Sequence, residues 1–200
     1  SDIEESHDPI IVIKDELGDA AETDTAIDKN DEADKCCDKI HIVYGDFNQN
    51  DAQPYKRYRV TYYARPSGDN EYYAVYKSKQ SWMQSTESAT GNWSSSCTEC
   101  FSGELIRDHL VDMEFIVFDK QGRAINPPPR PNDSSRVDLY NIKSVDVRLT
   151  FRSKNEFYRF NADEKKPRFV KGLGDRTRKF LDKYLRDSVV VTVNTRNIGS

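Results

Sequence analysis

Apolar and polar side chains alternate along four stretches of this chain, and this period of two narrows the choice of fold more than any other feature. Alternation places the apolar side chains of a strand on one face, whereas a helix needs a spacing of three to four residues. A turn sequence at residues 66–70 leads into a further extended run at 71–76. We therefore expect antiparallel strands that each bury one face. The four stretches are residues 40–44, 58–62, 111–117 and 145–151.

One segment near the C-terminus has helical spacing instead. Asp175 is a suitable N-terminal cap, and four apolar residues recur on one helical face before Arg186. These four are Phe180, Leu181, Tyr184 and Leu185. Residues 189–193 are predicted to form a last strand. The predicted class is α+β, an antiparallel sheet with one C-terminal helix. One helix cannot cover the apolar face of six or seven strands, so we expect an uncovered face and a truncated N-terminal helix.

The 200 residues suffice for one domain with a core, since 36% of them are hydrophobic and 11% aromatic. No stretch approaches the roughly 18 consecutive apolar residues of a membrane helix, so a soluble head is expected. Residues 2–38 carry fourteen acidic and three basic side chains. Such a run repels itself and stays solvated, apart from the apolar residues 9–13. We divide the single domain into an acidic N-terminal loop segment, 1–38, and a sheet head, 39–200.

The charge balance reverses in residues 148–186, which carry thirteen basic and five acidic side chains. Two interpretations stay open: the two ends of one chain neutralise each other, or the basic end of one copy meets an acidic neighbour. The second makes the basic stretch a partner-contact surface. Its candidate residues are Arg148, Arg152, Arg176, Arg178 and Lys179.

The four cysteines are the most specific local signal, as an adjacent pair, Cys36 and Cys37, and a CxxC motif, Cys97 and Cys100. Because adjacent cysteines bridge each other only through a strained peptide, we expect two bridges that join 36/37 to 97/100, with a Cys97–Cys100 bridge as the variant. A tetrathiolate zinc site and a redox-active CxxC are the weaker alternatives. Disulfides indicate an oxidising compartment such as the periplasm or the cell surface.

Oxygen-bearing side chains alternate directly after the first long strand, at Asp46, Asn48 and Asn50, with Asp51 beside them. This resembles the first half of a calcium loop, because calcium takes six to eight oxygen ligands. The sixth position, however, holds Asp51 instead of the expected glycine. A turn closed by Asx hydrogen bonds is the favoured interpretation, with calcium as the possible cofactor.

Catalytic motifs are scarce, so we predict that the chain is not an enzyme. His7, His41 and His109 stand in unlike contexts without metal-ligand spacing, and no nucleophile or phosphate-binding motif is present. Tyrosines alternate with basic residues at 55–63 and 157–160. That pattern suits single-stranded nucleic acid, but it is also ordinary for cross-strand pairs, so nucleic acid is the minority interpretation.

The order of the extended segments resembles that of PilW-like type IV pilus minor pilins, and part of it is shared by the J-type minor pseudopilins of type II secretion. The resemblance runs over about four fifths of the chain, residues 38–197, and includes a "D-x-N" turn, a Y-x-V-x-Y hairpin, a D-x-x-G turn and a terminal "V-x-x-R-N". The segments that carry it are residues 40–48, 58–63, 72–77, 110–115, 118–122, 142–153 and 191–197.

The resemblance implies a pilin-like head whose sheet packs on a long N-terminal helix. That helix would anchor the subunit in the inner membrane, facing the periplasm, and later join the pilus at the cell surface. The implied role is structural: priming or capping of a fibre through packing with other minor pilins and the major pilin. The alternative is a tip adhesin or DNA-uptake module. The processing motif, the glutamate at the fifth mature position and the apolar helix are not in this sequence, so no assembly residue is carried over.

Overall fold

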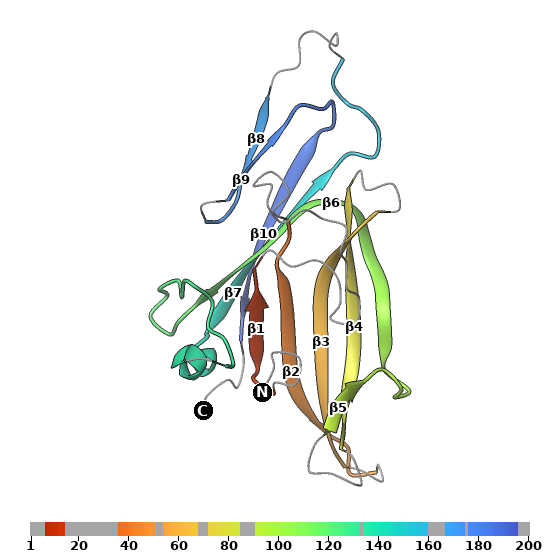
Figure 1. Ribbon diagram of the computed structural model, residues 1–200, viewed down its shortest axis with the longest axis vertical. Coiled ribbons are helices and arrows are strands. Elements are labelled where there is room, and N and C mark those ends of the chain that lie inside the picture. Colours follow the sequence, from red (N-terminus) through yellow and green to blue (C-terminus); the bar gives the residue numbers. More distant parts are fainter. Residues whose placement is uncertain are drawn as a thin grey trace.

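The computed structural model describes residues 7–14, 36–50, 54–67, 72–84, 91–132, 134–159, 167–174 and 176–195. These residues form ten strands and one short 3-10 helix (Figure 1). The strands are β1 (Ile10–Ile13), β2 (Lys39–Phe47), β3 (Tyr55–Pro66), β4 (Tyr73–Gln84), β5 (Gly91–Ser94), β6 (Phe101–Phe118), β7 (Ser144–Arg152), β8 (Arg168–Lys171), β9 (Thr177–Phe180) and β10 (Arg186–Asn194). The helix, η3, spans Ser134–Tyr140.

Eight strands make one sheet in the order β1-β2-β3-β4-β6-β7-β10, with β5 pairing the end of β4. Every pairing is antiparallel, which confirms the predicted antiparallel sheet. Strands β8 and β9 pair only with each other among the described residues and form a hairpin at one end of the molecule (Figure 1). The alternation in the sequence therefore identified the long strands correctly, because each of them has a buried side.

The long strand β6 changes partners halfway along. Its first half, residues 101–108, pairs with β4, and its second half, 110–118, pairs with β7. Between them His109 has a φ of 58°, a left-handed conformation that is uncommon outside glycine. The His109 ring lies 4.3 Å from the ring of Tyr72. This residue redirects β6, which runs beside β4 and then crosses toward β7 and β10 (Figure 1).

The bend folds the sheet over itself and encloses the core. One continuous cluster of buried residues joins the first half of the sheet to the second. The backbone N–H of Asp38, just before β2, donates to the carbonyl of Met113 in β6 at 2.8 Å. The core therefore lies between two parts of the same sheet. Its members include Ile10, Val12, Ile40, Ala64 and Val75 on one side and Leu110, Met113, Phe115, Val117 and Val145 on the other.

This arrangement corrects the expectation of a sheet face left uncovered. The second half of β6, with β7, covers most of the apolar face of β1–β4, since burial of apolar surface drives a bent sheet to close on itself. The exception is the last strand, β10, where Val189, Val191 and Val193 are each about half exposed, at 53%, 51% and 50%. The face of β7 and β10 that continues the core therefore carries exposed apolar side chains at the β10 end of the sheet.

The predicted C-terminal helix is wrong. Residues 177–180 form β9, residues 181–185 are irregular, and β10 begins at Arg186; Asp175 lies outside the described residues. Two aromatic side chains of the supposed helical face bind cations instead: the Arg186 guanidinium lies 3.7 Å from the Phe180 ring centre and that of Arg152 lies 4.1 Å from Tyr184. These cation–π contacts and the β8–β9 ladder outweigh a helical spacing of four residues.

The single short helix lies elsewhere, in the segment after the prolines that the sequence marked as irregular. Leu139 of η3 is fully buried in the core. Arg136 and Tyr140, also in η3, bind the buried carboxylate of Asp8, with the Tyr140 hydroxyl donating at 2.7 Å. The N-terminal residues are therefore attached to the fold by strand β1, by the ion pair of Asp8 with Arg136 and by a second ion pair of Lys14 with Asp38.

Part of the segment expected to be a solvated acidic loop is also buried. Cys36, Cys37 and Asp38 are at most 2% exposed and belong to the interior. The acidic residues 15–35 lie outside the described residues.

Candidate functional site

A buried network of charges joins the N-terminal segment to the second half of β6 and to the β8–β9 hairpin. Arg176 Nη2 donates to Asp38 Oδ1 at 2.7 Å, and Arg176 Nη1 donates to Asp112 Oδ1 at 2.9 Å. Asp38 Oδ2 accepts from Lys14 Nζ at 2.7 Å and from the backbone N–H of Phe115 at 2.9 Å. Both carboxylates are almost completely buried. Buried carboxylates require such partners, so the network fixes three distant segments to one another.

Burial has a clear electrostatic effect at Asp112. It raises the pKa of the Asp112 carboxyl above its ordinary value of 3.8, and the attraction of Arg176 and Arg178 only partly offsets that rise. A third cation stands close by, since Arg148 Nη1 lies 3.9 Å from Asp112 Oδ2. The network therefore holds an ionised carboxyl in a place that favours its neutral form.

The turn of the β8–β9 hairpin is held by a second carboxylate of β6, Glu114. Its Oε2 accepts from the backbone N–H of Leu173 at 2.7 Å, and its Oε1 from that of Gly174 at 3.3 Å. A Cβ atom on Gly172 would lie 2.5 Å from Glu114 Oε2 and 3.0 Å from the Arg176 carbonyl oxygen, so a larger residue there would displace the Glu114 carboxylate. The hairpin is therefore anchored at its turn, next to the Arg176 network.

Most of the basic residues predicted to contact a partner are used inside the subunit. Arg176 belongs to the buried network, and the Arg148 side chain is only 8% exposed. The Arg152 guanidinium stacks on Tyr184, and Arg178 Nη1 donates to the carbonyl of Val111 at 2.6 Å. The basic stretch is thus neutralised in part by the acidic end of its own chain, at Asp38.

Lys179 is the predicted contact residue that faces outward. The β8–β9 register pairs Phe169 with Lys179 and Lys171 with Thr177, and all four side chains are exposed. Phe169 itself is 61% exposed. This outer face of the hairpin, defined by these four residues, combines two cations with an aromatic ring and carries no acidic side chain.

The cysteines form two local pairs, Cys36–Cys37 and Cys97–Cys100, so the predicted bridges between 36/37 and 97/100 are wrong. The variant bridge is present, with Cα atoms 4.9 Å apart. Each pair is held in its own surroundings: Cys36 Sγ lies 3.4 Å from the Val111 carbonyl in the core, whereas the other pair closes the turn between β5 and β6.

Among the described residues, one set of potential metal ligands comes together: the sulfurs of Cys36 and Cys37 with a carboxylate oxygen of Asp112, all within 4.8 Å. Both sulfurs are bonded to each other and Asp112 already binds Arg176. The set is therefore a disulfide beside an ion pair. The tetrathiolate alternative does not assemble.

The turn after β2 has the geometry of Asx hydrogen bonds. The backbone N–H of Phe47 donates to Asp46 Oδ1 at 2.9 Å, and that of Asn50 donates to Asn48 Oδ1 at 3.1 Å. These side chains are exposed, and Asp51 lies outside the described residues. The backbone bonds accepted by Asp46 and Asn48 account for an aspartate and an asparagine at these positions. Calcium binding stays a prediction.

The tyrosine alternation serves the sheet at several positions. Tyr63 is fully buried and its hydroxyl accepts from Ser78 at 3.3 Å. Tyr58 is 4% exposed, with Lys79 Nζ 4.3 Å from its ring centre. By contrast, Tyr55 is 79% exposed. The first two rings are therefore committed to packing and cannot stack on a ligand.

The three histidines do not assemble into a site. The ring of His7 packs 4.2 Å from Trp82, and His41 Nδ1 lies 2.8 Å from the Thr61 hydroxyl. Burial lowers the pKa of both imidazoles, so both are neutral near pH 7. His109 occupies the bend of β6. Each histidine thus has a separate structural contact.

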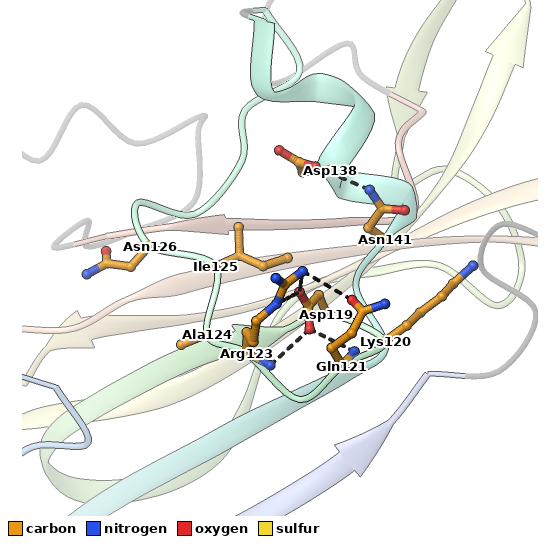
Figure 2. Close-up of a pocket in the computed structure, with 9 residues that line it drawn as sticks. All are labelled: Asp119, Lys120, Gln121, Arg123, Ala124, Ile125, Asn126, Asp138 and Asn141. Carbon is orange, nitrogen blue, oxygen red and sulfur yellow. Dashed lines mark hydrogen bonds and ion pairs between the residues drawn. The ribbon is translucent and has the colours of Figure 1, made fainter.

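A polar hollow of about 550 Å³ opens beside the turn that follows β6 (Figure 2). The Asp119 carboxylate accepts from the backbone N–H groups of Gln121 and Arg123, at 2.8 and 2.9 Å, and pairs with the Arg123 guanidinium. The bond from the Arg123 backbone N–H is the main cause that lowers the pKa of Asp119. Gly122 has a φ of 75°, as the turn requires. The polar groups therefore stabilise the D-x-x-G turn. The lining residues are Asp119, Lys120, Gln121, Arg123, Ala124, Ile125, Asn126, Asp138 and Asn141.

The exposed valines of β10 form a surface that was not predicted from the sequence. Val190 is 51% exposed on the opposite face from Val189, Val191 and Val193. Four valines within five positions were interpreted simply as a strand. The detectable signal was that this run lacks the polar alternation of the other strands, which indicates contact on both faces.

None of the helices in the described residues is both long and apolar enough to cross a membrane. No protein-family model and no curated protein matches the sequence. Among solved structures, the chain is similar to the type IV-like pilin TTHA1219 from Thermus thermophilus, with 8% identity and a TM-score of 0.46. The match covers 96% of this chain and 85% of that chain.

Proposed function

We propose that this chain is the head of a minor pilin or pseudopilin, a structural subunit that primes or caps a type IV pilus-like fibre by packing against other pilins. One observation carries the proposal. The segments whose order resembles PilW-like minor pilins are successive strands of one antiparallel sheet. Residues 40–48 lie in and just after β2, 58–63 in β3, 72–77 at β4, 110–115 in β6, 142–153 at β7, and 191–195 at β10.

The apolar end of the sheet supports a role in packing. On the face that continues the core, Val147 and Leu149 of β7 are partly buried, and Val189, Val191 and Val193 of β10 are about half exposed. Because these valines are already half buried, completing their burial is worth roughly half of the 1.5–3 kcal/mol gained when a fully exposed side chain is buried. In the proposed fibre, an apolar helix would pack across this face.

The remaining parts of the proposal follow from this role. The partners are other minor pilins and the major pilin, and the inner membrane is reached through an N-terminal helix. The subunit works in the periplasm and then at the cell surface, where disulfides persist. Its function is assembly, without catalysis.

Deletion of the gene in its source bacterium tests the proposal. We expect fewer surface fibres by negative-stain electron microscopy, with recovery when the intact gene is returned. Chemical cross-linking in those cells, followed by mass spectrometry, should join this chain to other pilin subunits. Unchanged fibre number together with no pilin cross-links would contradict the proposal.

A second candidate function is a tip module that binds a polyanion such as single-stranded DNA. It is favoured by the outer face of the hairpin, where Lys171 and Lys179 flank the exposed ring of Phe169. Binding of labelled single-stranded DNA should weaken steadily as salt rises, because phosphate contacts release counterions. Lys171→Glu with Lys179→Glu should abolish binding, whereas Lys120→Glu, at the hollow, should not. Salt-independent or absent binding removes this candidate.

A further inference from the structure

The second half of β6 has one edge that no described strand completes. On one side residues 110–118 pair with β7, and on the other side the pairing with β4 stops at Leu110. Beyond Leu110 no described strand pairs with this edge. A backbone bond reaches across from the N–H of Asp38 to the carbonyl of Met113, at 2.8 Å. The bent sheet therefore meets itself along a seam between β6 and the segment just before β2.

Side chains satisfy backbone groups along this seam. Arg178 Nη1 donates to the carbonyl of Val111 at 2.6 Å, and Arg176 Nη1 donates to that of Met113 at 3.3 Å. Lys14 supplies a further cation to a carbonyl next along β6. Carbonyl groups without a ladder partner need such donors. Both arginines belong to the β8–β9 hairpin, so the hairpin closes its part of the seam.

The hairpin, which runs from Arg168 to Phe180, is held on β6 by polar groups. Its turn is fixed by the Glu114 carboxylate, which accepts from the backbone N–H groups of Leu173 and Gly174. Among the described residues, β8 and β9 contribute no side chain to the buried core and pair only with each other. An isolated two-stranded hairpin is marginally stable in water, and regions with few buried apolar contacts open most easily. The hairpin therefore depends on its contacts with β6.

Closing the hairpin over β6 brings opposing electrostatic effects. It gives the carboxylates of Asp38 and Asp112 their shared cation, Arg176. Burial, however, raises the pKa of the Asp112 carboxyl, and the attraction of Arg176 and Arg178 only partly offsets that rise. A buried ion pair gains little net free energy when desolvation offsets its attraction. The closed arrangement is therefore favoured over an open one by only a small margin.

We propose that the β8–β9 hairpin is a strap that opens and closes as a unit over this seam while the main sheet stays folded. Opening breaks the contacts of Glu114, Arg176 and Arg178 and leaves the ladders of the main sheet paired. Residues 181–185, which form no strand or helix, provide the hinge before β10. The open strap gives solvent access to the polar groups of β6 at residues 111–114. The strap does not depend on the proposed function.

Hydrogen exchange of the unaltered chain, followed by mass spectrometry, tests whether the strap opens separately. Backbone amides of β8 and β9 should exchange about tenfold or more faster than those of β7, because the hairpin opens without unfolding of the sheet. Strand β7 is the internal reference, since it pairs with β6 on one side and β10 on the other. Equal protection of the hairpin and of β7 would mean that they open together, which overturns the proposal.

Two glycines of the hairpin turn give a matched pair of variants. A Cβ atom on Gly172 would lie 2.5 Å from Glu114 Oε2, whereas one on Gly174 would make an ordinary contact, 3.6 Å from Glu114 Oε1. Gly172→Ala should therefore displace the Glu114 carboxylate and speed exchange in the hairpin by about tenfold. Gly174→Ala should leave that exchange almost unchanged. If the two variants have the same exchange in the hairpin, Glu114 does not hold the strap and the proposal fails.

A core variant tests the independence of the sheet. Ile40→Val removes a methyl group from the core, where Ile40 is 4% exposed, and should speed exchange in β3 by roughly fivefold. Exchange in β8 and β9 should stay the same, because the packing of Ile40 is intact when the strap is open. A hairpin that speeds up as much as β3 opens only by global unfolding, and that result overturns the proposal. None of these results touches the fibre-deletion test.

Discussion

The two halves of β6 differ in how deeply their side chains are buried and in how regularly they pair. In residues 101–108, Leu105 and Ile106 are 55% and 50% exposed, and the ladder to β4 is interrupted by register shifts. In residues 110–118, Leu110 and Met113 are at most 1% exposed, and the pairing with β7 has one shift, near its start. Each half pairs with one strand, β4 or β7, but only the second half has a face that packs in the core, so the cover over that face decides burial.

The first half of β6 also differs from the other exposed edge, β10. Gly103, with a φ of 74°, and the register shifts make the first half of β6 irregular, and Glu104 and Asp108 add exposed charges. Irregularity and charge are the usual protection of an edge. Strand β10 pairs with β7 without a register shift, and its two charged residues, Arg186 and Asp187, lie together at its start. An exposed edge is therefore protected in one part of this molecule and available for pairing in another.

The largest expected loss of stability comes from a core substitution in the second half of β6. Phe115→Ala should lower the free energy of unfolding by about 3–5 kcal/mol, because Phe115 is 3% exposed in the core and the change leaves a cavity. Leu105→Ala, in the exposed first half, should stay within about 0.5 kcal/mol. Urea denaturation measures both. Similar losses for the two variants would remove the distinction between the halves.

The next effect concerns the ionic contacts of the second half. Arg176→Met should cost about 3 kcal/mol, because it leaves the buried carboxylates of Asp38 and Asp112 without their shared cation. Lys179→Met, on the outer face of β9, is the control and should be almost neutral. The same denaturation experiment applies. A loss below about 1 kcal/mol for Arg176→Met would show that the network is not needed for folding.

A smaller effect is expected at the entrance to the first half. Replacing Cys97 and Cys100 together by serine should cost about 2 kcal/mol at most, because the bridge closes a loop of only four residues. Thermal unfolding with and without reductant measures this. Reductant should lower the melting temperature of the unaltered chain more than that of the double variant if the Cys97–Cys100 bridge is formed.

The pH dependence of the second half follows from Asp112. Its folded-state pKa is raised above 3.8, so the ionised carboxyl costs folding free energy that is absent in acid and fully present above the raised pKa. Stability contributed by this group therefore falls as pH rises through that window. Compared with Asp112→Asn, the unaltered chain should lose stability between acid and neutral pH in urea titrations. If the unaltered chain instead gains stability relative to Asp112→Asn as pH rises, the pKa of Asp112 is not raised in the folded state.

The smallest loss of stability is expected from Glu99, in the turn just before the exposed first half of β6. Glu99→Gln removes an ion pair to Lys79, whose Nζ lies 2.9 Å from Glu99 Oε2. The hydrogen bond from Lys79 to Glu99 raises the pKa of Lys79. Because Glu99 is 65% exposed, the expected loss is below about 1 kcal/mol and should vanish at high salt. A larger, salt-independent loss would show that the Lys79–Glu99 ion pair contributes more than a solvent-exposed pair can.

Local signals predicted the strands well and the C-terminal segment badly. The alternation of Val145, Val147 and Leu149 identified β7, because every second side chain there enters the core. The spacing of Phe180 and Tyr184 suggested a helix, yet their rings are taken by Arg186 and Arg152. Contacts between residues that lie near each other only in space cannot be read from spacing alone.

The candidate site shows the same limit. The sequence alone was sufficient to place Arg148, Arg176 and Arg178 in a strongly basic stretch. Whether those charges face a partner or their own chain depended on where Asp38 and Asp112 came to lie. The disulfide partners were likewise undecided, since the identity of four cysteines does not determine which two become neighbours.

The sequence by itself determined that this chain forms antiparallel strands, because a period of two puts apolar side chains on one face whatever the strands pair with. It also determined the reversal of charge between the two ends. Only the tertiary structure decided that the sheet bends at His109, covers its own face and leaves β10 open. The physical reason is that closure of the core depends on contacts between residues distant in sequence, and local patterns carry no information about which distant segments meet.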